Sequence, residues 1–190
     1  MFNFILFGPP GSGKGTQSVK IAEKYNLAHI STGDIFRKNI SEETELGIKV
    51  KGIIEKGELV PDELLIEILE DAMDSFAGIK GYVFDGFPRT TQQAKDLDVI
   101  LQKRGDSVSM VLALVVNDDE IITRLITRAE IQGRKDDTRD VIENRINVYN
   151  SQTQPLINFY TEKKKFVSVN GIGSIDEIFI EVCKKIDAKI

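Results

Sequence analysis

A glycine-rich segment carrying one lysine lies near the start of the chain and has the composition of a phosphate-binding loop. Residues 8–16 read GPPGSGKGT and follow the apolar run 2–7. Glycines let several backbone N–H groups point at one anion, and a following helix adds partial positive charge at its N-terminus. Lys14 can reach the outer phosphates of a nucleotide, whereas the alternative interpretation is a plain glycine-rich turn before a helix. Because Gly15 separates this lysine from Thr16, where the usual pattern has Ser or Thr directly after the lysine, we expect Thr16 to serve phosphate more than metal.

Charged residues further along the chain could supply the rest of a phosphate chemistry. Asp85 ends the run GYVFD and suits a Walker-B-like role near a metal ion, with a turn hydrogen bond as the alternative. Arg37 and Arg89 follow the segments STGD and DGFP, and a planar, permanently charged guanidinium suits phosphate oxygens. Arg124 lies one helical turn before Arg128, and its interpretation stays open between exposed surface and a supporting role.

Apolar runs of strand length must position these residues. The runs are 2–7, 28–31, 82–85, 110–116 and 166–169. The run 110–116 is apolar on both faces, as expected of a central parallel strand. Segments of helical character separate the runs, which implies right-handed crossovers. The alternation therefore predicts an α/β fold with a doubly wound sheet of five parallel strands.

Some of the segments between the strands show the apolar periodicity of a helix clearly, and others do not. One apolar stripe follows Pro61, and another comprises Ile121, Ile122, Leu125 and Ile126. Ser174 and Glu177 predict a capping box for a last helix, on whose apolar stripe Cys183 lies. Two stretches, 32–76 and 129–138, fit the alternation poorly. We expect both to be excursions from the sheet over the carboxyl ends of its strands, where ligands bind.

Composition narrows the class of protein. The chain has 190 residues, 41% of them hydrophobic and 29% charged, and a formal net charge of -5, which suits one globular domain and does not favour nucleic-acid binding. The longest apolar run is far too short to cross a bilayer, and the N-terminus has no basic region of a signal peptide. A single cysteine excludes an intramolecular disulfide and a multi-cysteine zinc site. We therefore expect a cytoplasmic protein that does not bind membranes.

Several ordered segments resemble the nucleoside monophosphate kinases, and within them adenylate kinases with a short lid. They are GPPGSGKGTQ (8–17), HISTGDIFR (29–37), KGELVPDE (56–63), FDGFPRTTQQA (84–94), GRKDD (133–137) followed by Arg145, and VNGIGS (169–174). The resemblance covers essentially the whole chain. It implies a single P-loop kinase domain that spans residues 1–190 and has the P-loop NTPase fold. Within this domain, the resemblance implies a helical NMP-binding insertion at 31–60 and a short lid at 127–137. The implied reaction is ATP + AMP to two ADP, with Mg²⁺ accompanying ATP.

The resemblance also implies a site for each nucleotide. ATP binding is expected of Gly11, Ser12, Gly13, Lys14, Gly15, Thr16, Arg128 and Gly173. AMP binding is expected of Thr32, Arg37, Glu58, Leu59, Val60, Gly86, Phe87, Pro88, Arg89, Gln93, Arg134 and Arg145. The catalytic cations are expected to be Lys14, Arg89, Arg128, Arg134 and Arg145. Asp34 and Asp85 are expected to orient metal-bound water and not to ligate the metal, because magnesium keeps much of its water shell.

Charge neutralisation is the main task of such a site. The two nucleotides bring about six negative charges together, of which one magnesium ion cancels two. The acceptor oxygen belongs to a phosphate whose second pKa is about 6, so no catalytic base is required. His29, the only histidine, is accordingly expected to be structural.

The choice of acceptor base depends on Thr32 and Gln93. A glutamine amide can read the donor and acceptor edge of adenine, and backbone groups at 58–60 can complete that site. The pattern resembles adenylate kinases, whereas pyrimidine monophosphate kinases more often show Ala and Asn at these two places. AMP is therefore the favoured acceptor, and a UMP/CMP kinase is the alternative. Gln93 as an exposed helix residue is the second alternative.

The segment expected to form the lid is short. About ten residues separate Arg128 from Arg139, too few for a metal-binding knuckle, so we expect no structural zinc. Closure of such a lid would exclude water that otherwise hydrolyses ATP. A non-enzymatic nucleotide switch is a third hypothesis, but the strings D-x-x-G and N-K-x-D of GTPase switches do not occur. No segment demands a partner to bury an apolar face, so a monomer is expected.

Overall fold

A parallel sheet forms the centre of the computed structural model, which describes residues 1–132 and 138–189. Its five strands lie in the order β2-β3-β1-β4-β5 and pair in parallel throughout. They are β1 (Phe2–Phe7), β2 (Ala28–Ser31), β3 (Gly81–Asp85), β4 (Met110–Val115) and β5 (Phe166–Asn170). The predicted α/β class and all five predicted strands are confirmed, with ends that differ by a single residue at three places.

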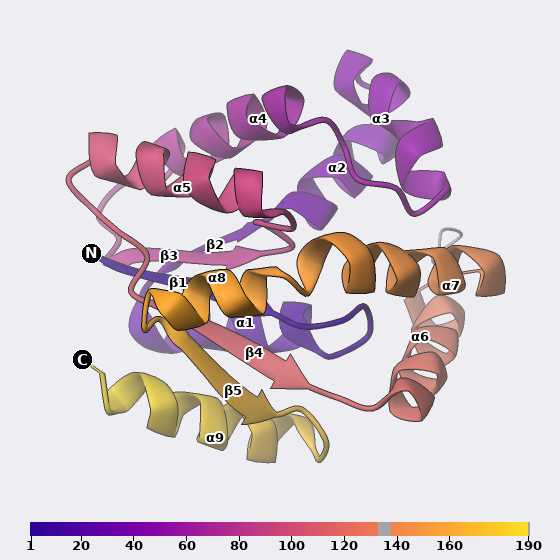
Figure 1. The fold of residues 1–190 in the computed structure, drawn as a ribbon. Helices are drawn as coiled ribbons and strands as arrows, with labels where there is room; N and C mark the ends of the chain where they lie inside the picture. The colour runs from indigo at the N-terminus through magenta and orange to yellow at the C-terminus, as the bar shows by residue number, and fades with distance from the viewer. Residues whose placement is uncertain (133–137, 190) are drawn as a thin grey trace.

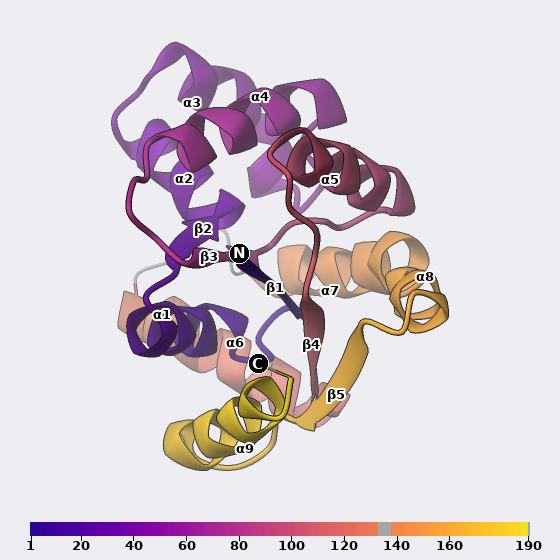
Figure 2. The ribbon, with the colours of Figure 1, turned by 90° about the vertical axis from the view of Figure 1, so that its left-hand side faces the viewer.

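Helices connect the strands and cover both faces of the sheet (Figure 1). In chain order they are α1 (Lys14–Tyr25), α2 (Thr32–Ser41), α3 (Glu45–Glu55), α4 (Asp62–Asp74), α5 (Thr91–Lys103), α6 (Asp118–Gln132), α7 (Arg139–Val148), the π-helix η1 (Tyr149–Thr153), α8 (Leu156–Glu162) and α9 (Ile175–Asp187). Figure 2 shows α1 and α9 on one side of the sheet and α4, α5 and α8 on the other. Within the described ranges, none of these helices is both long and apolar enough to span a bilayer.

Strand β1 shows why the sheet is buried on both sides. Phe4 and Leu6 pack in a core cluster with residues of α1 and α9. Ile5 and Phe7 point the other way and pack with residues of α4, α5 and α8. This period-two alternation gives each layer of helices its own apolar face of the same strand. Asn3 is the one polar residue of this strand, and hydrogen bonds compensate for the burial of its amide. The amide donates to Ser107 O at 3.0 Å and accepts from Tyr82 N–H at 3.2 Å.

The apolar stripe expected on α6 is only half correct. Ile121 and Leu125 are buried, but the side chains of Ile122 and Ile126 are 44% and 51% exposed. The reason is that α6 packs through one narrow edge against α7 and the phosphate loop and does not lie across the sheet, so only two of the four isoleucine and leucine side chains reach the core. Sequence periodicity does not reveal how wide a helix contact is.

The last helix follows its prediction closely. The Ser174 side chain accepts a hydrogen bond from Glu177 N–H, and the Glu177 carboxylate accepts one from Ser174 N–H, which completes the capping box. Ile178, Val182 and Cys183 on this helix are buried. The cap starts α9 directly after the loop that follows β5, so it also fixes that loop at the carboxyl edge of the sheet.

The excursion between β2 and β3 is helical, as expected. Ser31 caps α2 by accepting a hydrogen bond from Asp34 N–H at 3.3 Å. Gly47 lets α3 cross α2 closely, since a Cβ there would lie 2.1 Å from Asn39 O. The α2–α3 pair therefore forms a tight unit beside the carboxyl ends of β2 and β3. In Figure 1 both chain termini lie at the opposite end of the molecule from α6 and α7.

Candidate active site

The loop between β1 and α1 wraps around the amino end of α1. Gly11 and Gly13 adopt left-handed φ angles of 78° and 94°, which residues with a side chain rarely adopt. A Cβ at Gly11 would also meet Leu125 Cγ at 2.9 Å, so the loop packs directly on α6. Ser12 between them is buried. The loop geometry and the helix end behind it match the anion-binding arrangement expected from the sequence.

Lys14 is folded against its own loop. Its Nζ donates to Gly8 O at 2.7 Å and to Pro9 O at 2.8 Å. The pKa of Lys14 is lowered to about 8, mainly by burial; the charge of Asp85 opposes this shift, and the charges of Arg89 and Arg128 add to it. The ammonium group therefore lies in a region where an arriving polyanion would restore its usual basicity.

Arg89 forms the second cationic centre. Its Nε donates to Gly86 O at 2.8 Å, and Thr32 Oγ1 donates to the same oxygen at 3.1 Å. Burial lowers the pKa of Arg89, and the charges of Arg145 and Arg37 act in the same direction against that of Asp85. Positive groups from α1, α2, α6, α7 and the loop after β3 thus influence one another at the carboxyl end of the sheet. Such a cluster is a binding site for several phosphates.

Two carboxylates lie among these cations. Asp85 ends β3 and is buried, and its Oδ2 lies 3.4 Å from where a Cβ on Gly15 would be, so it faces the phosphate loop. Asp34 is more exposed, and its Oδ1 pairs with Arg37 Nη2 at 2.5 Å. His29 Nε2 lies 2.9 Å from Ser18 Oγ and 4.0 Å from Asp85 Oδ2. Across the described ranges, no group of three or more His, Cys, Asp or Glu side chains is placed to hold a metal ion.

Gln93 is buried, contrary to the alternative that it is an exposed helix residue. Its side chain is at the start of α5, where Thr90 caps the helix by accepting from Gln93 N–H at 3.1 Å. Its Oε1 accepts from Arg89 N–H at 2.7 Å, and its Nε2 donates to Asp62 Oδ1 at 2.7 Å. The neighbouring Gln92 is exposed and bonds to Asp96 on its own helix. The two adjacent glutamines therefore have different surroundings.

The phosphate loop, the arginines, the two carboxylates and Gln93 line one cavity of about 850 Å³. The residues predicted from the sequence that line it are Gly11, Ser12, Gly13, Lys14, Gly15, Thr16, Thr32, Asp34, Arg37, Glu58, Leu59, Val60, Asp85, Gly86, Phe87, Pro88, Arg89, Gln93, Arg128, Arg145 and Gly173. Arg134 lies outside the described residues. The volume is near the upper end of the range for ligand sites, and segments from the whole length of the chain contribute to it.

Several lining residues are not among those that the sequence assigned to a nucleotide. Arg124, whose interpretation was open, lines the cavity, where its Nε pairs with Glu120 at 2.7 Å and its Nη1 reaches Ser12 O at 3.5 Å. Phe36 and Leu65 form part of the apolar wall. The signal for Arg124 was its one-turn spacing from a predicted site residue. The apolar residues gave no signal, because core side chains in amphipathic helices have the same pattern.

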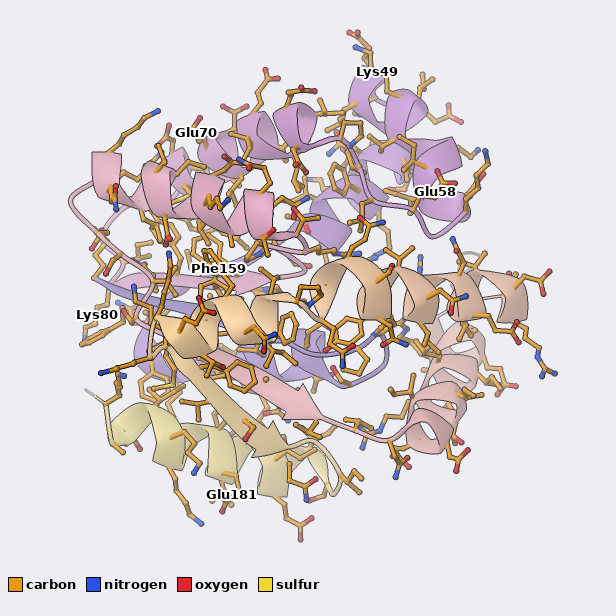
Figure 3. The ribbon with its side chains drawn as sticks, viewed as in Figure 1. Lys49, Glu58, Glu70, Lys80, Phe159 and Glu181 are labelled. Atoms are coloured by element: carbon orange, nitrogen blue, oxygen red, sulfur yellow. The ribbon has the colours of Figure 1, made fainter. Side chains whose placement is uncertain are left out.

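Helix α7 contacts the segment that joins α3 to α4. Asn144 Nδ2 donates to Lys56 O at 2.6 Å. A Cβ at Gly57 would lie 3.0 Å from Arg145 Cγ, so the two segments touch without a gap. Figure 3 labels Glu58 on this segment, above α7 in the view. Two segments nearly ninety residues apart in the sequence therefore touch beside the cavity, and both contribute residues to its lining.

Comparison with known proteins agrees with this geometry. A family model described as adenylate kinase matches residues 6–165. A curated adenylate kinase of Bacteroides thetaiotaomicron is 51% identical over 187 residues, which cover 98% of this chain and 99% of that protein. Adenylate kinases of Flavobacterium psychrophilum (49% identical, covering 94% of each chain) and Maricaulis maris (44% identical, covering 98% of this chain and 100% of that protein) are also similar. This chain belongs to the adenylate kinase family.

Proposed function

We propose that the cavity holds ATP over the phosphate loop and AMP against Arg89 and Gln93, and that the chain transfers the terminal phosphoryl group reversibly to give two ADP. Membership of the adenylate kinase family supports this reaction. The observation that carries the assignment of the two sites is geometric. Lys14 on the phosphate loop and Arg89 after β3 belong to different segments, yet both line one cavity of about 850 Å³. Two cationic centres that face one cavity suit two nucleotides whose phosphates meet end to end.

The proposed mechanism is alignment with charge stabilisation. The AMP phosphate has a second pKa of about 6, so its attacking oxygen is already deprotonated at neutral pH. Lys14 and Arg128 would hold the donor phosphates, while Arg37, Arg89 and Arg145 would hold the acceptor phosphate. The same groups would stabilise the charge on the phosphoryl group during transfer. The role of Arg134 in this set is proposed from the sequence resemblance alone.

Magnesium is proposed to enter with ATP. The buried Asp85 carboxylate, which faces the phosphate loop, supplies a hard oxygen that can accept hydrogen bonds from the waters that magnesium keeps. Asp34 is the second carboxylate that lines the cavity. Because it already pairs with Arg37, it would hold the magnesium-bound water less strongly than Asp85. When bound, the ion would neutralise phosphate charge. Asp85 would fix the position of its water shell beside Lys14.

Two segments beside the cavity could close over the bound nucleotides. We propose that the segments 31–60 and 127–137 close over AMP and ATP respectively, and that closure excludes water from the phosphoryl group. The first six residues of the second segment continue α6, so the proposed lid begins inside that helix. We further propose a monomeric enzyme that works in the cytoplasm.

An acceptor assay tests the proposed function directly. ADP formation would be measured from ATP with AMP, CMP, UMP and GMP offered separately at equal concentrations. We expect AMP to be the efficient acceptor, because the buried Gln93 amide offers both a donor and an acceptor to a purine edge. Efficient phosphorylation of CMP or UMP with AMP ignored would replace the proposal by a pyrimidine monophosphate kinase.

The lowered pKa of Lys14 predicts a pH dependence of ATP binding. Below pH 8 the ammonium is already charged, so binding needs no proton. Above pH 8 it is largely neutral in the free enzyme, whereas bound phosphates would restore the charge, so binding must take up a proton and the affinity must fall as pH rises. We expect the Kd for ATP to rise by up to about tenfold per pH unit above pH 8, with uptake of about one proton per site. Calorimetry at pH 9 in buffers of different ionisation enthalpy measures that uptake.

The matched variant for this test is Lys14→Arg. Arginine stays charged through this pH range, so the variant should bind ATP without proton uptake even if its absolute affinity is lower. Absence of proton uptake by the wild-type protein at pH 9 would contradict the role given to Lys14.

A further inference from the structure

The Gln93 amide is held by two partners of opposite polarity. Arg89 N–H can only donate, and it points at Gln93 Oε1 over 2.7 Å. The Asp62 carboxylate can only accept when ionised, and it receives Gln93 Nε2–H over 2.7 Å. Asp62 reaches this position from the first turn of α4, while Gln93 stands in the first turn of α5. The glutamine side chain is 1% exposed, so water does not substitute for either partner.

These two contacts fix which way the amide faces. A rotated amide would place its carbonyl oxygen against the carboxylate of Asp62 and its NH₂ group against the backbone N–H of Arg89. Both encounters are repulsive and leave buried polar atoms unpaired. An unrestrained glutamine has no such preference, because its oxygen and nitrogen ends have nearly the same shape.

The orientation decides what the amide presents to the cavity. After the bonds to Arg89 and Asp62, Oε1 retains one lone pair and Nε2 retains one N–H. A purine with an amino group at C6 offers a ring acceptor at N1 beside a donor at C6, which this pair matches. A purine with an oxo group at C6 carries a proton on N1 and an acceptor at C6, which matches only the rotated amide.

We propose that Asp62 is a positioning residue that selects a 6-amino purine over a 6-oxo purine by holding the Gln93 amide in one orientation. The inference rests on the proposed function, in that Gln93 is taken to face the acceptor base. A simple helix-end role does not account for the contact. Glu63 provides the same negative charge in the first turn of α4 from an exposed position, whereas Asp62 turns inward to a buried amide.

The test is Asp62→Asn, with AMP and inosine monophosphate as alternative acceptors. Inosine monophosphate differs from AMP only in its C6 oxo group and its N1 proton, so it isolates the edge that the amide reads. The asparagine amide can either donate a hydrogen bond to the Gln93 side chain or accept one from it. The variant therefore no longer favours one orientation of the Gln93 amide at this contact. A hydrogen bond to a charged group changes an equilibrium by about 10–100-fold, so we expect kcat/KM for inosine monophosphate to rise by about that factor relative to AMP.

The change for AMP itself should be small. Arg89 N–H still favours the original orientation in the variant, so most molecules remain competent for AMP and its KM should change by no more than about twofold. The control is Glu63→Gln, which removes the same charge from the same helix turn and should leave the ratio of the two acceptors unchanged. A merely structural role for Asp62 would lower the rate with both acceptors and lower the melting temperature, without moving that ratio.

A third variant separates failure of this inference from failure of the proposed function. Gln93→Ala should raise the KM for AMP by at least about tenfold, because it removes both hydrogen bonds to the base. An unchanged KM for AMP in Gln93→Ala would overturn the proposed base site and the inference with it. A second outcome is that Gln93→Ala raises the KM for AMP, but Asp62→Asn and Glu63→Gln give the same ratio of kcat/KM for inosine monophosphate to kcat/KM for AMP. In that case the base site stands, and only the role of Asp62 is overturned.

Discussion

Replacement of Arg89 by alanine should lower kcat by about 10²–10³-fold, the cost of removing one preorganised group that stabilises transition-state charge. Arg89 is the guanidinium whose pKa is shifted by burial and by the charges of Arg145 and Arg37, so it lies at the centre of the cationic cluster. The KM for AMP should rise as well, because Arg89 is proposed to hold the AMP phosphate before transfer; the fall in kcat reports the stabilisation that arises only during transfer. Steady-state kinetics of ADP formation provide the measurement.

The variant should still fold, which makes the result interpretable. Gly86 O loses the bond from Arg89 Nε but keeps the one from Thr32 Oγ1, so the turn after β3 stays anchored. Arg104→Ala is the matched control, because that arginine pairs with Asp74 and does not line the cavity within the described part of the chain. It should leave kcat unchanged. Near-normal turnover in Arg89→Ala would remove this residue from the catalytic set.

The strands could be predicted because their sequence signal is local. The run that became β1 ends at Gly8 and Pro9, residues that strands tolerate poorly, and the predicted ends of β1 and β2 both agree with the observed ones. The apolar character of β4 on both faces reflects its position inside the sheet. The phosphate loop could also be predicted from its local sequence, because the position before α1 needs a positive φ and is occupied by Gly13. In each case neighbouring residues alone determine the structure.

Features that depend on contacts between distant segments could not be predicted in the same way. Asp62 looks like an ordinary acidic residue in the first turn of a helix, and only the packing of α4 against α5 brings its carboxylate to Gln93, thirty-one positions away. Ile122 and Ile126 share the spacing of buried residues but are exposed, because the packing contacts of α6 are made by Ile121 and Leu125. The cations of the site were predicted through the family resemblance, because periodicity does not distinguish a cavity arginine from a surface arginine.

A molecule made of two adenosines joined by five phosphates should bind about 10²–10⁴-fold more tightly than ATP or AMP alone. Once one adenosine is bound, attachment of the second is intramolecular and occurs at a high effective concentration. The phosphate chain would run from Lys14 towards Arg89, which face the same cavity and whose charges influence each other. Titration calorimetry of the three ligands under one set of ionic conditions measures the gain.

The gain must come from two base sites and not from phosphate charge alone, because any polyphosphate is attracted to a cluster of arginines. An adenosine carrying five phosphates and no second nucleoside has the same bridge and serves as the matched ligand. It should bind far more weakly than the double nucleoside, and the difference should shrink in Gln93→Ala, because the buried amide on the acceptor side is then absent. If the two ligands bind equally well to the wild-type protein, phosphate attraction accounts for the affinity, and the second adenosine has no site on this chain.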